Sequence, residues 1–213
     1  MILSCLGHSK FLIELACGMR IVTDPFDRET GYPVRPVKAD AVLVSHHHHD
    51  HDAADTVDGH PQVIDGAGVH TLAKGVTVTG IPSFHDDAQG AKRGPNVMFL
   101  LEAEGLRVAH LGDLGHLPGK DAVKLLDPVD VLMLPVGGHF TIGAREALET
   151  ASLLHARVIL PMHYRTRATA SWPIAPVDDF LALCGEAVEA PLLRVTKEDL
   201  TCQPHVAVLR AQD

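Results

Sequence analysis

The feature that most constrains this chain is a run of metal-ligand residue types placed directly after a short apolar segment. Ala41–Val44 is four residues long and partly β-branched, which is typical of a buried strand. Residues 46–51 follow with the sequence His-His-His-His-Asp-His. The fold must therefore present this polar run at the end of a buried strand.

The run divides into two sets if the strand continues through it. Side chains alternate along an extended backbone, so His47 and His49 should point away from the rest. The remaining pattern, His-x-His-x-Asp-His, consists of His46, His48, Asp50 and His51. Three imidazoles and a carboxylate suit a borderline metal such as zinc. Four groups this close together cannot easily all face one ion, so they fit two adjacent ions better.

Further ligand types occur where later apolar runs end. His85, Asp113 and His163 each lie in or next to a segment that follows such a run. Loops at strand ends commonly display catalytic groups. We therefore expect these three side chains to complete the site.

Apolar periodicity predicts a strand-rich first half and an alternation of helices and strands in the second half. Strands are expected at Met1–Leu6, Phe11–Ala16, Arg20–Thr23, Ala41–Val44, Val69–Leu72, Val76–Thr79, Val97–Ala103, Leu106–Leu111, Val131–Leu134, Val158–Leu160, Leu192–Val195 and His205–Leu209. Helices are expected at Asp121–Leu126, at Gly143–His155 with Thr141 as N-cap, and at Val177–Val188 with Phe180, Leu181, Leu183 and Cys184 inward. Residues 26–38 and Ile81–Pro95 are predicted as loops, and residues 53–68 are weakly patterned. Together these elements indicate one mixed α/β sandwich domain over residues 1–213.

Charge and composition exclude several classes of function. The net charge is 18 − 27 = −9, which argues against a general binder of nucleic acid or anionic membranes. No apolar run approaches the length of a membrane span, and the N-terminus does not have the pattern of a signal peptide. The four cysteines are widely separated, at Cys5, Cys17, Cys184 and Cys202. We therefore expect a cytoplasmic protein with reduced thiols.

Seven stretches carry a resemblance to a known family. They are Leu6–Ser9 with Phe11, Thr23–Pro25, Ser45–His51, His85, Gly112-Asp113, Pro135–Thr141 and Pro161–Tyr164. On these residues the sequence resembles the metallo-β-lactamase superfamily. Within it, the chain is similar to the short metal-dependent hydrolases related to L-ascorbate-6-phosphate lactonase.

This resemblance implies a four-layer αββα sandwich with a binuclear metal site at the edge between its two sheets. The implied ligands are His46, His48 and His85 for one ion, Asp50, His51 and His163 for the other, and Asp113 as the bridge. Zinc is the favoured ion, with manganese or iron as alternatives. His48 stands where the di-iron oxidoreductases of the superfamily have Glu, which favours a hydrolase. The segment after His51 is short, so the usual helix there is expected to be trimmed.

The chemistry expected of such a site is hydrolysis by a metal-bound hydroxide. Asp50 and Asp113 are the predicted catalytic residues, which would orient the hydroxide and carry its proton. The substrate would be a small anionic ester, lactone or phosphoester. The absence of a Gly-x-Ser-x-Gly elbow agrees with a mechanism that needs no serine nucleophile. The alternatives are a nuclease or phosphodiesterase of the same fold, and a non-enzymatic histidine-rich metal-binding protein.

Substrate contacts are predicted at positions near the expected ligands. The candidates are His8, Arg93, His139 and Arg165. Guanidinium groups suit a phosphate or carboxylate, although solvated loop charge explains the arginines equally well. His110 is expected to be structural, as are His60, His70, His116, His155 and His205. The expected partner is a small molecule rather than a membrane, and the sequence leaves open a homo-oligomeric state.

Overall fold

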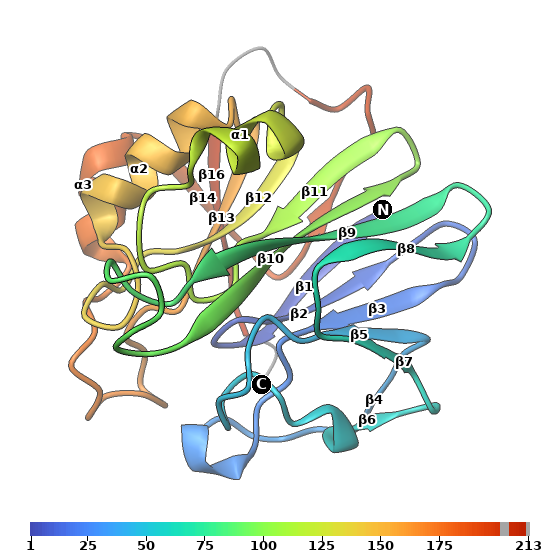
Figure 1. Cartoon of the computed structure of the whole chain (residues 1–213), viewed down its shortest axis with the longest axis horizontal. Helices are drawn as coiled ribbons and strands as arrows, with labels where there is room; N and C mark the ends of the chain where they lie inside the picture. The colour runs from blue at the N-terminus through green and yellow to red at the C-terminus, as the bar shows by residue number, and fades with distance from the viewer. Residues whose placement is uncertain (201–204, 212–213) are drawn as a thin grey trace.

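Two β-sheets stack face to face in a computed structural model that describes residues 1–200 and 205–211 (Figure 1). The first sheet has the strand order β15-β1-β2-β3-β5-β7, with bounds Leu193–Arg194, Ile2–Gly7, Lys10–Glu14, Arg20–Thr23, Ala41–Leu43 and Gln62–Ile64. The second has the order β14-β16-β13-β12-β11-β10-β9-β8, with bounds Ala187–Ala190, His205–Leu209, Val158–Met162, Val131–Pro135, Leu106–His110, Pro95–Ala103, Val76–Phe84 and Gly68–Ala73. Cys202 lies outside the described residues.

Alternating apolar residues fill the space between the sheets. Leu3 of β1 and Phe11 of β2 share one buried cluster with Phe99 and Leu101 of β10. Intervening residues face outward, such as Leu12 of β2, which belongs to a separate cluster on the outer face of the first sheet. This period of two is the reason these runs form strands with both faces covered.

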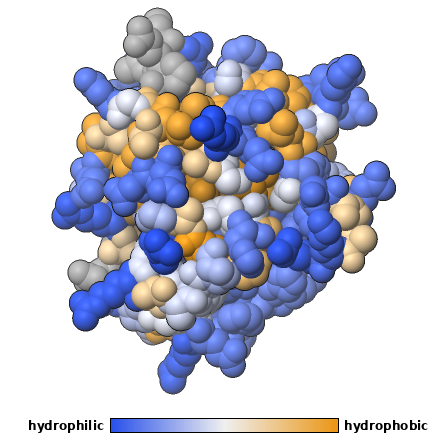
Figure 2. Space-filling view, turned by 90° about the vertical axis from the view of Figure 1, so that its left-hand side faces the viewer, coloured by the Kyte–Doolittle hydropathy of each residue, from blue (hydrophilic) through white to orange (hydrophobic). Residues whose placement is uncertain are grey.

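The helices cover the outer face of the second sheet (Figure 1). They are α1, α2 and α3, at Lys120–Leu126, Ala144–Leu153 and Asp178–Cys184. Figure 2 looks at the left-hand side of Figure 1, and apolar side chains gather in its upper half, where the helical layer lies. Each helix exposes one leucine to solvent, namely Leu125, Leu153 and Leu183.

Irregular chain covers the outer face of the first sheet. Its regular pieces are two 3-10 helices, Arg28–Thr30 and Ala54–Thr56, and the short pair β4 and β6, Val37–Lys38 and Val57–Asp58. The sandwich predicted from the sequence is confirmed. The trimmed helix after His51 is also confirmed, because only a single 3-10 turn stands between His51 and β6.

Strand direction brings the predicted ligand loops to one edge. β3 and β5 are parallel, and β1 runs with them because β2 is antiparallel to both of its neighbours. In the second sheet β11, β12 and β13 are parallel, and β9 shares their direction through the antiparallel β10. In each sheet these strands run in one direction, so their carboxyl ends lie at the same edge of that sheet. The segments after β1 and β5 therefore leave the first sheet at one edge, and the segments after β9, β11 and β13 leave the second sheet at one edge.

Three boundaries predicted from the sequence are wrong. The loop expected at Ile81–Pro95 spans only residues 85–94, because β9 continues to Phe84 and β10 begins at Pro95. The last helix ends at Cys184 instead of Val188, since Gly185 adopts a positive φ of 83°. Val188 belongs to β14 and is 60% exposed.

Two side-chain roles also differ. Leu183, expected to face inward, is 38% exposed. Thr141 is not the N-cap of α2; Gly143 holds that position, and its backbone N–H donates to the Glu146 carboxylate at 3.0 Å. The weakly patterned residues 53–68 include the edge strand β7. No helix in the described part of the chain is long and apolar enough to cross a membrane.

Candidate metal centre

The histidine run after β5 forms a turn rather than a continued strand. The backbone N–H groups of His51 and Asp52 both donate to the carbonyl of His48, at 2.8 and 3.0 Å. In the sequence, alternation along an extended strand separated His47 and His49 from the other residues. That reason is wrong, because the backbone turns here. His47 and His49 lie outside the two ligand groups described below, and their rings lie within ion-pair distance of aspartates: Asp52 and Asp65 for His47, and Asp27 for His49.

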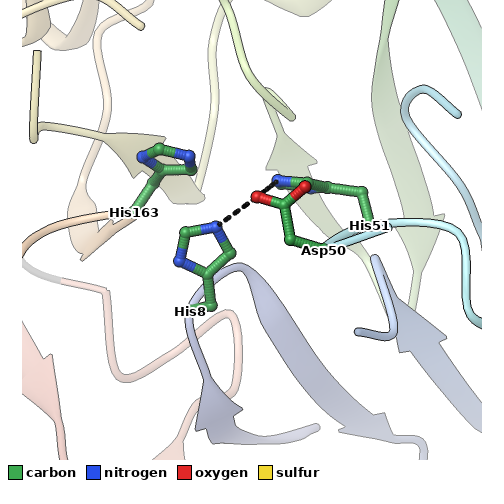
Figure 3. A group of neighbouring side chains, drawn as sticks. All are labelled: His8, Asp50, His51 and His163. Atoms are coloured by element: carbon green, nitrogen blue, oxygen red, sulfur yellow. Dashed lines mark ion pairs between the residues drawn. The ribbon is translucent and has the colours of Figure 1, made fainter. Parts of the chain in front are cut away.

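Six of the seven predicted ligand side chains, all except Asp113, come together in two adjoining groups. One group comprises His46, His48 and His85, and the other comprises His8, Asp50, His51 and His163. Within each group the ligand atoms lie within 4.8 Å of one another. Figure 3 shows the second group, with the Asp50 carboxylate between the rings of His8 and His51. His8 is the member of this group that was not predicted as a ligand.

The Asp113 carboxylate lies between the two groups. Its Oδ2 is 3.2 Å from Nε2 of His85 in the first group and 3.0 Å from Nε2 of His163 in the second. Its Oδ1 is 3.3 Å from Nε2 of His51. One carboxylate thus reaches both groups, which is the geometry that a bridging ligand requires.

Asp24, which is buried next to the site, determines which ring nitrogen of His51 and His46 carries a proton. Its carboxylate can only accept, so Nδ1 of His51, at 2.8 Å, must carry the proton and donate it. The Ser45 hydroxyl also donates to Asp24, at 2.7 Å, and so can only accept from Nδ1 of His46, at 2.9 Å. In the neutral His46 ring Nε2 is therefore left without a proton, with its lone pair available, and in His51 Nε2 is the atom at which a metal ion would take the place of a proton. Such carboxylate–histidine pairs are common behind metal ligands.

Buried atoms without hydrogen-bond partners show that the site fits a metal. Nε2 of His46, Nε2 of His51 and Oδ1 of Asp113 are all buried and have no hydrogen-bond partner in the described structure. Leaving buried acceptors unsatisfied is costly. Neutral imidazoles and carboxylates are also the donors that zinc and similar divalent ions prefer.

The electrostatics keep the carboxylates ionised and His46 neutral. Burial would raise the pKa of Asp113, but His163 and His51 outweigh it and hold that pKa well below its usual range. Burial, reinforced by His51, lowers the pKa of His46 to about 3. His51 is the exception: burial opposes its charge, yet Asp113 and Asp24 raise its pKa well above the usual value. A cation at this position would replace that proton.

Backbone strain and close packing also mark the site. His8, Asp24 and His163 have positive φ angles of 53°, 37° and 52°, and such strain clusters at functional sites. At Gly112, also at positive φ, an added Cβ would lie 2.3 Å from Oδ1 of Asn96. That oxygen accepts from the backbone N–H of Asp113 at 2.9 Å, so Gly112 lets Asn96 hold Asp113 in place.

Known proteins match the chain over most of its length. The model of the Beta-lactamase superfamily domain matches residues 2–163. A UPF0173 metal-dependent hydrolase of Thermococcus kodakarensis is 32% identical, over 91% of this chain and 96% of its own. The chain belongs to the UPF0173 metal-dependent hydrolases of the metallo-β-lactamase superfamily. The narrower resemblance to L-ascorbate-6-phosphate lactonase stays a prediction.

A solved structure agrees with this membership. A crystal structure of a proposed Zn-dependent hydrolase of the superfamily from Thermotoga maritima is 38% identical, with a TM-score of 0.80 and 98% of each chain covered. A UPF0173 metal-dependent hydrolase of Carboxydothermus hydrogenoformans is 32% identical over 81% of this chain. The chain is therefore a metal-dependent hydrolase.

The metal-ligand groups of this UPF0173 hydrolase open into a cavity of about 700 Å³. Arg93, predicted to contact substrate, lines it, and its guanidinium lies 5.5 Å from the centroid of the Phe140 ring. Sequence reasoning missed Phe140, Ser171, Trp172 and Pro173, which line the same cavity. The single Trp of the chain, between Ser and Pro in a loop, was the available signal.

Three predicted substrate residues lie elsewhere. His139 is exposed and packs edge-on against Phe140, and it does not line the cavity. Arg165 also lies outside, because its backbone N–H bonds to the Ala175 carbonyl and its side chain is exposed. His8 is buried behind Asp50 rather than facing the cavity, with Nε2 3.3 Å from Oδ2. His110 is structural as expected: its Nε2 donates to the Ser9 carbonyl at 3.0 Å.

Proposed function

We propose that this UPF0173 protein is a binuclear hydrolase of a small anionic ester, lactone or phosphoester. The single observation that carries the proposal is the position of Asp113, whose two oxygens face ligand histidines of both groups. A one-metal site would need neither the second group nor a carboxylate between them.

The proposed ligands follow the two groups. His46, His48 and His85 would hold one ion; Asp50, His51 and His163 would hold the other; Asp113 would contact both. When bound, two divalent ions lower the pKa of a water molecule and polarise the oxygen under attack. The donor set favours zinc, with manganese and iron as alternatives.

The chain's own residues would supply orientation and proton transfer. Asp50 lines the cavity, and the exposed part of its carboxylate can accept a proton from a nucleophilic water. His8, behind it, can donate a hydrogen bond that holds the carboxylate in place. Asp113 would fix the direction of the attacking oxygen through its contacts with His85 and His163.

The cavity supports a small anionic substrate. Arg93 is its only lysine or arginine among the described lining residues, and Phe140 and Trp172 offer flat apolar surfaces. One guanidinium suits one phosphate or carboxylate. A polynucleotide would need a track of cations and stacking aromatics, so the nuclease alternative is the weaker one.

The test combines metal content with a substrate panel. Wild-type protein should hold about two ions per chain, and His163→Ala should hold fewer, while His155→Ala, altered on the exposed surface, should match the wild type. Lactones, carboxylic esters, phosphomonoesters and phosphodiesters, each with and without a second anionic group, then define the substrate. One ion or none in gently purified wild type would remove the two-metal proposal.

Arg93→Met tests the anion preference. KM for the anionic members of the panel should rise about tenfold or more, since a charge-assisted hydrogen bond is lost. Lys92→Met is the matched control, because Lys92 is an exposed neighbour paired with Asp87 and lies outside the cavity. Equal losses in both variants would mean that loop charge, not Arg93, attracts the substrate.

The non-enzymatic alternative makes the opposite prediction. A histidine-rich metal buffer would hold several weak ions through exposed imidazoles, so its metal content would fall in a His47→Ala/His49→Ala double variant. The hydrolase should keep its ions in that variant. We also propose a cytoplasmic location, because Cys5, Cys17 and Cys184 are all free thiols.

A further inference from the structure

A buried lysine lies on the outer face of the first sheet. Lys10 is the first residue of β2, and its side chain points away from the inter-sheet core that receives the next residue, Phe11. Only 2% of Lys10 is exposed to solvent. A lysine this deeply buried normally has a partner for its charge.

Lys10 has no such partner in the described part of the chain. No carboxylate or carbonyl there lies within bonding distance of its Nζ, and the contact that is present is the Phe26 ring, 5.3 Å away at its centroid. Burial lowers the pKa of Lys10 to about 8, so the amine is still mostly charged at neutral pH. An unpaired buried charge is expensive, which indicates that something else supplies the negative charge.

The Lys10 side chain opens onto a cavity of about 220 Å³. Its cationic lining residues are Lys10, Arg20, Arg35 and Lys38, and none of its described lining residues is a carboxylate. The remaining walls are apolar. This volume is below that of ordinary metabolite pockets and is suited to an ion or one small charged group. In a chain of net charge −9, such a concentration of cations is a local feature.

Arg20 supplies a second unsatisfied donor at this cavity. Its Nε is buried without a hydrogen-bond partner, and it forms a long ion pair of 3.4 Å with Oε1 of the half-buried Glu14. Lys38, at the mouth, is exposed and has no ion pair among the described residues. The unsatisfied donors are thus cationic and belong to two neighbouring strands, β2 and β3.

We propose that this cavity, which we name the Lys10 cavity, is an anion site separate from the metal centre and binds phosphate, either as the free ion or as the end of a small phosphate monoester. Lys10 would be its buried contact, and Arg20 and Lys38 would complete the charge. Several cationic side chains around a small cavity favour binding of a multiply charged oxyanion over binding of a single carboxylate. The small volume leaves no room for a polymer.

The test is calorimetric titration of the metal-loaded protein with inorganic phosphate at constant ionic strength, set by sodium chloride. Lys10→Met keeps the length of the side chain and removes its charge, and should weaken phosphate binding about tenfold or more. Lys124→Met, an exposed lysine on α1, should bind phosphate as the wild type does. Both variants should keep the wild-type kcat. A parallel titration with glycerol phosphate distinguishes free phosphate from a phosphate monoester as the ligand. A site that binds only the free ion would not bind glycerol phosphate.

Thermal unfolding shows whether a loss of phosphate binding in a variant comes from a folding defect. In phosphate-free buffer Lys10→Met should unfold at or above the wild-type temperature, because it removes an uncompensated charge, and phosphate should raise the transition of the wild type by more than that of the variant. If that variant does not fold, Arg20→Gln carries the test, with a several-fold loss expected. Phosphate binding that is unchanged in the folded variants, or absent at millimolar concentrations in the wild type, would overturn the proposal.

Discussion

At the residue scale, the metal centre depends on a carboxylate that does not face it. Asp24 is fully buried and accepts from the Ser45 backbone N–H, the Ser45 hydroxyl and Nδ1 of His51. An asparagine would keep the shape but offer one acceptor oxygen and an unwanted donor. Asp24→Asn should therefore weaken metal retention about 10- to 100-fold, measured by competition with a chelator. Asp65→Asn, exposed beside His47, is the control, and equal retention in both variants would contradict the role of Asp24.

His8 acts on the same scale through Asp50. Burial, reinforced by His163, lowers the pKa of His8 to about 4, so the neutral ring can donate to Asp50 at neutral pH. We expect His8→Phe, which fills the space without a donor, to lower kcat about 10- to 100-fold with little change in KM. His8→Gln, which keeps a donor, should recover part of the rate. A change confined to KM would assign His8 to substrate binding instead.

At the scale of elements, one aspartate organises the loop of residues 85–94. Asp86 is buried, and its carboxylate accepts from the backbone N–H groups of Ala88, Gly90, Lys92 and Arg93 at 2.7 to 2.9 Å. The loop carries the proposed ligand His85 at one end and Arg93 at the other. Asp86→Asn should therefore impair both metal retention and KM. Asp87→Asn, its exposed neighbour, should impair neither.

The same carboxylate predicts a pH dependence. Burial would raise the pKa of Asp86, but the backbone N–H groups lower it from 3.8 to about 2. A depressed carboxyl pKa contributes stability that is complete above the unfolded pKa and is lost as the pH falls through the folded one. The difference in Tm between wild type and Asp86→Asn should therefore be constant above about pH 5 and shrink towards pH 2. A difference that persists at pH 2 would show that the amide harms packing instead.

Sequence patterns predicted the elements that have strict periodicity and missed those set by tertiary contacts. The strands from β1 to β13 that line the core have alternating or continuous apolar runs, and the ligands at their ends follow from strand direction. The turn at residues 46–51 was missed because its hydrogen bonds to the His48 carbonyl leave no trace in composition. Trp172 and Phe140 lie far apart in the chain and line one cavity only in the folded state. Asp86 has four backbone partners that no local motif reveals.

At the scale of the whole molecule, the site joins the two sheets. His8 and residues 46–51 extend from the first sheet, and His85, Asp113 and His163 extend from the second. In the protein itself one direct link between these loops is the backbone bond from the His163 N–H to the His8 carbonyl, at 3.4 Å. Bound metal would therefore hold together two halves of the core, and its binding free energy would add to the stability of the fold.

Metal removal should consequently lower the Tm of the wild type. It should also reverse which of the two proteins, wild type or Asp113→Asn, has the higher Tm. At ion concentrations near a thousand times Kd, each site adds about 4 kcal/mol, or roughly 10 °C for a domain of this size. Without ions, Asp113 is a buried charge that relies on His51 and His163, and an amide of the same shape avoids that cost. We therefore expect the variant to unfold below wild type in zinc-containing buffer and at or above it in chelator, by calorimetry. A variant less stable than wild type in both buffers would mean that Asp113 supports the fold independently of metal.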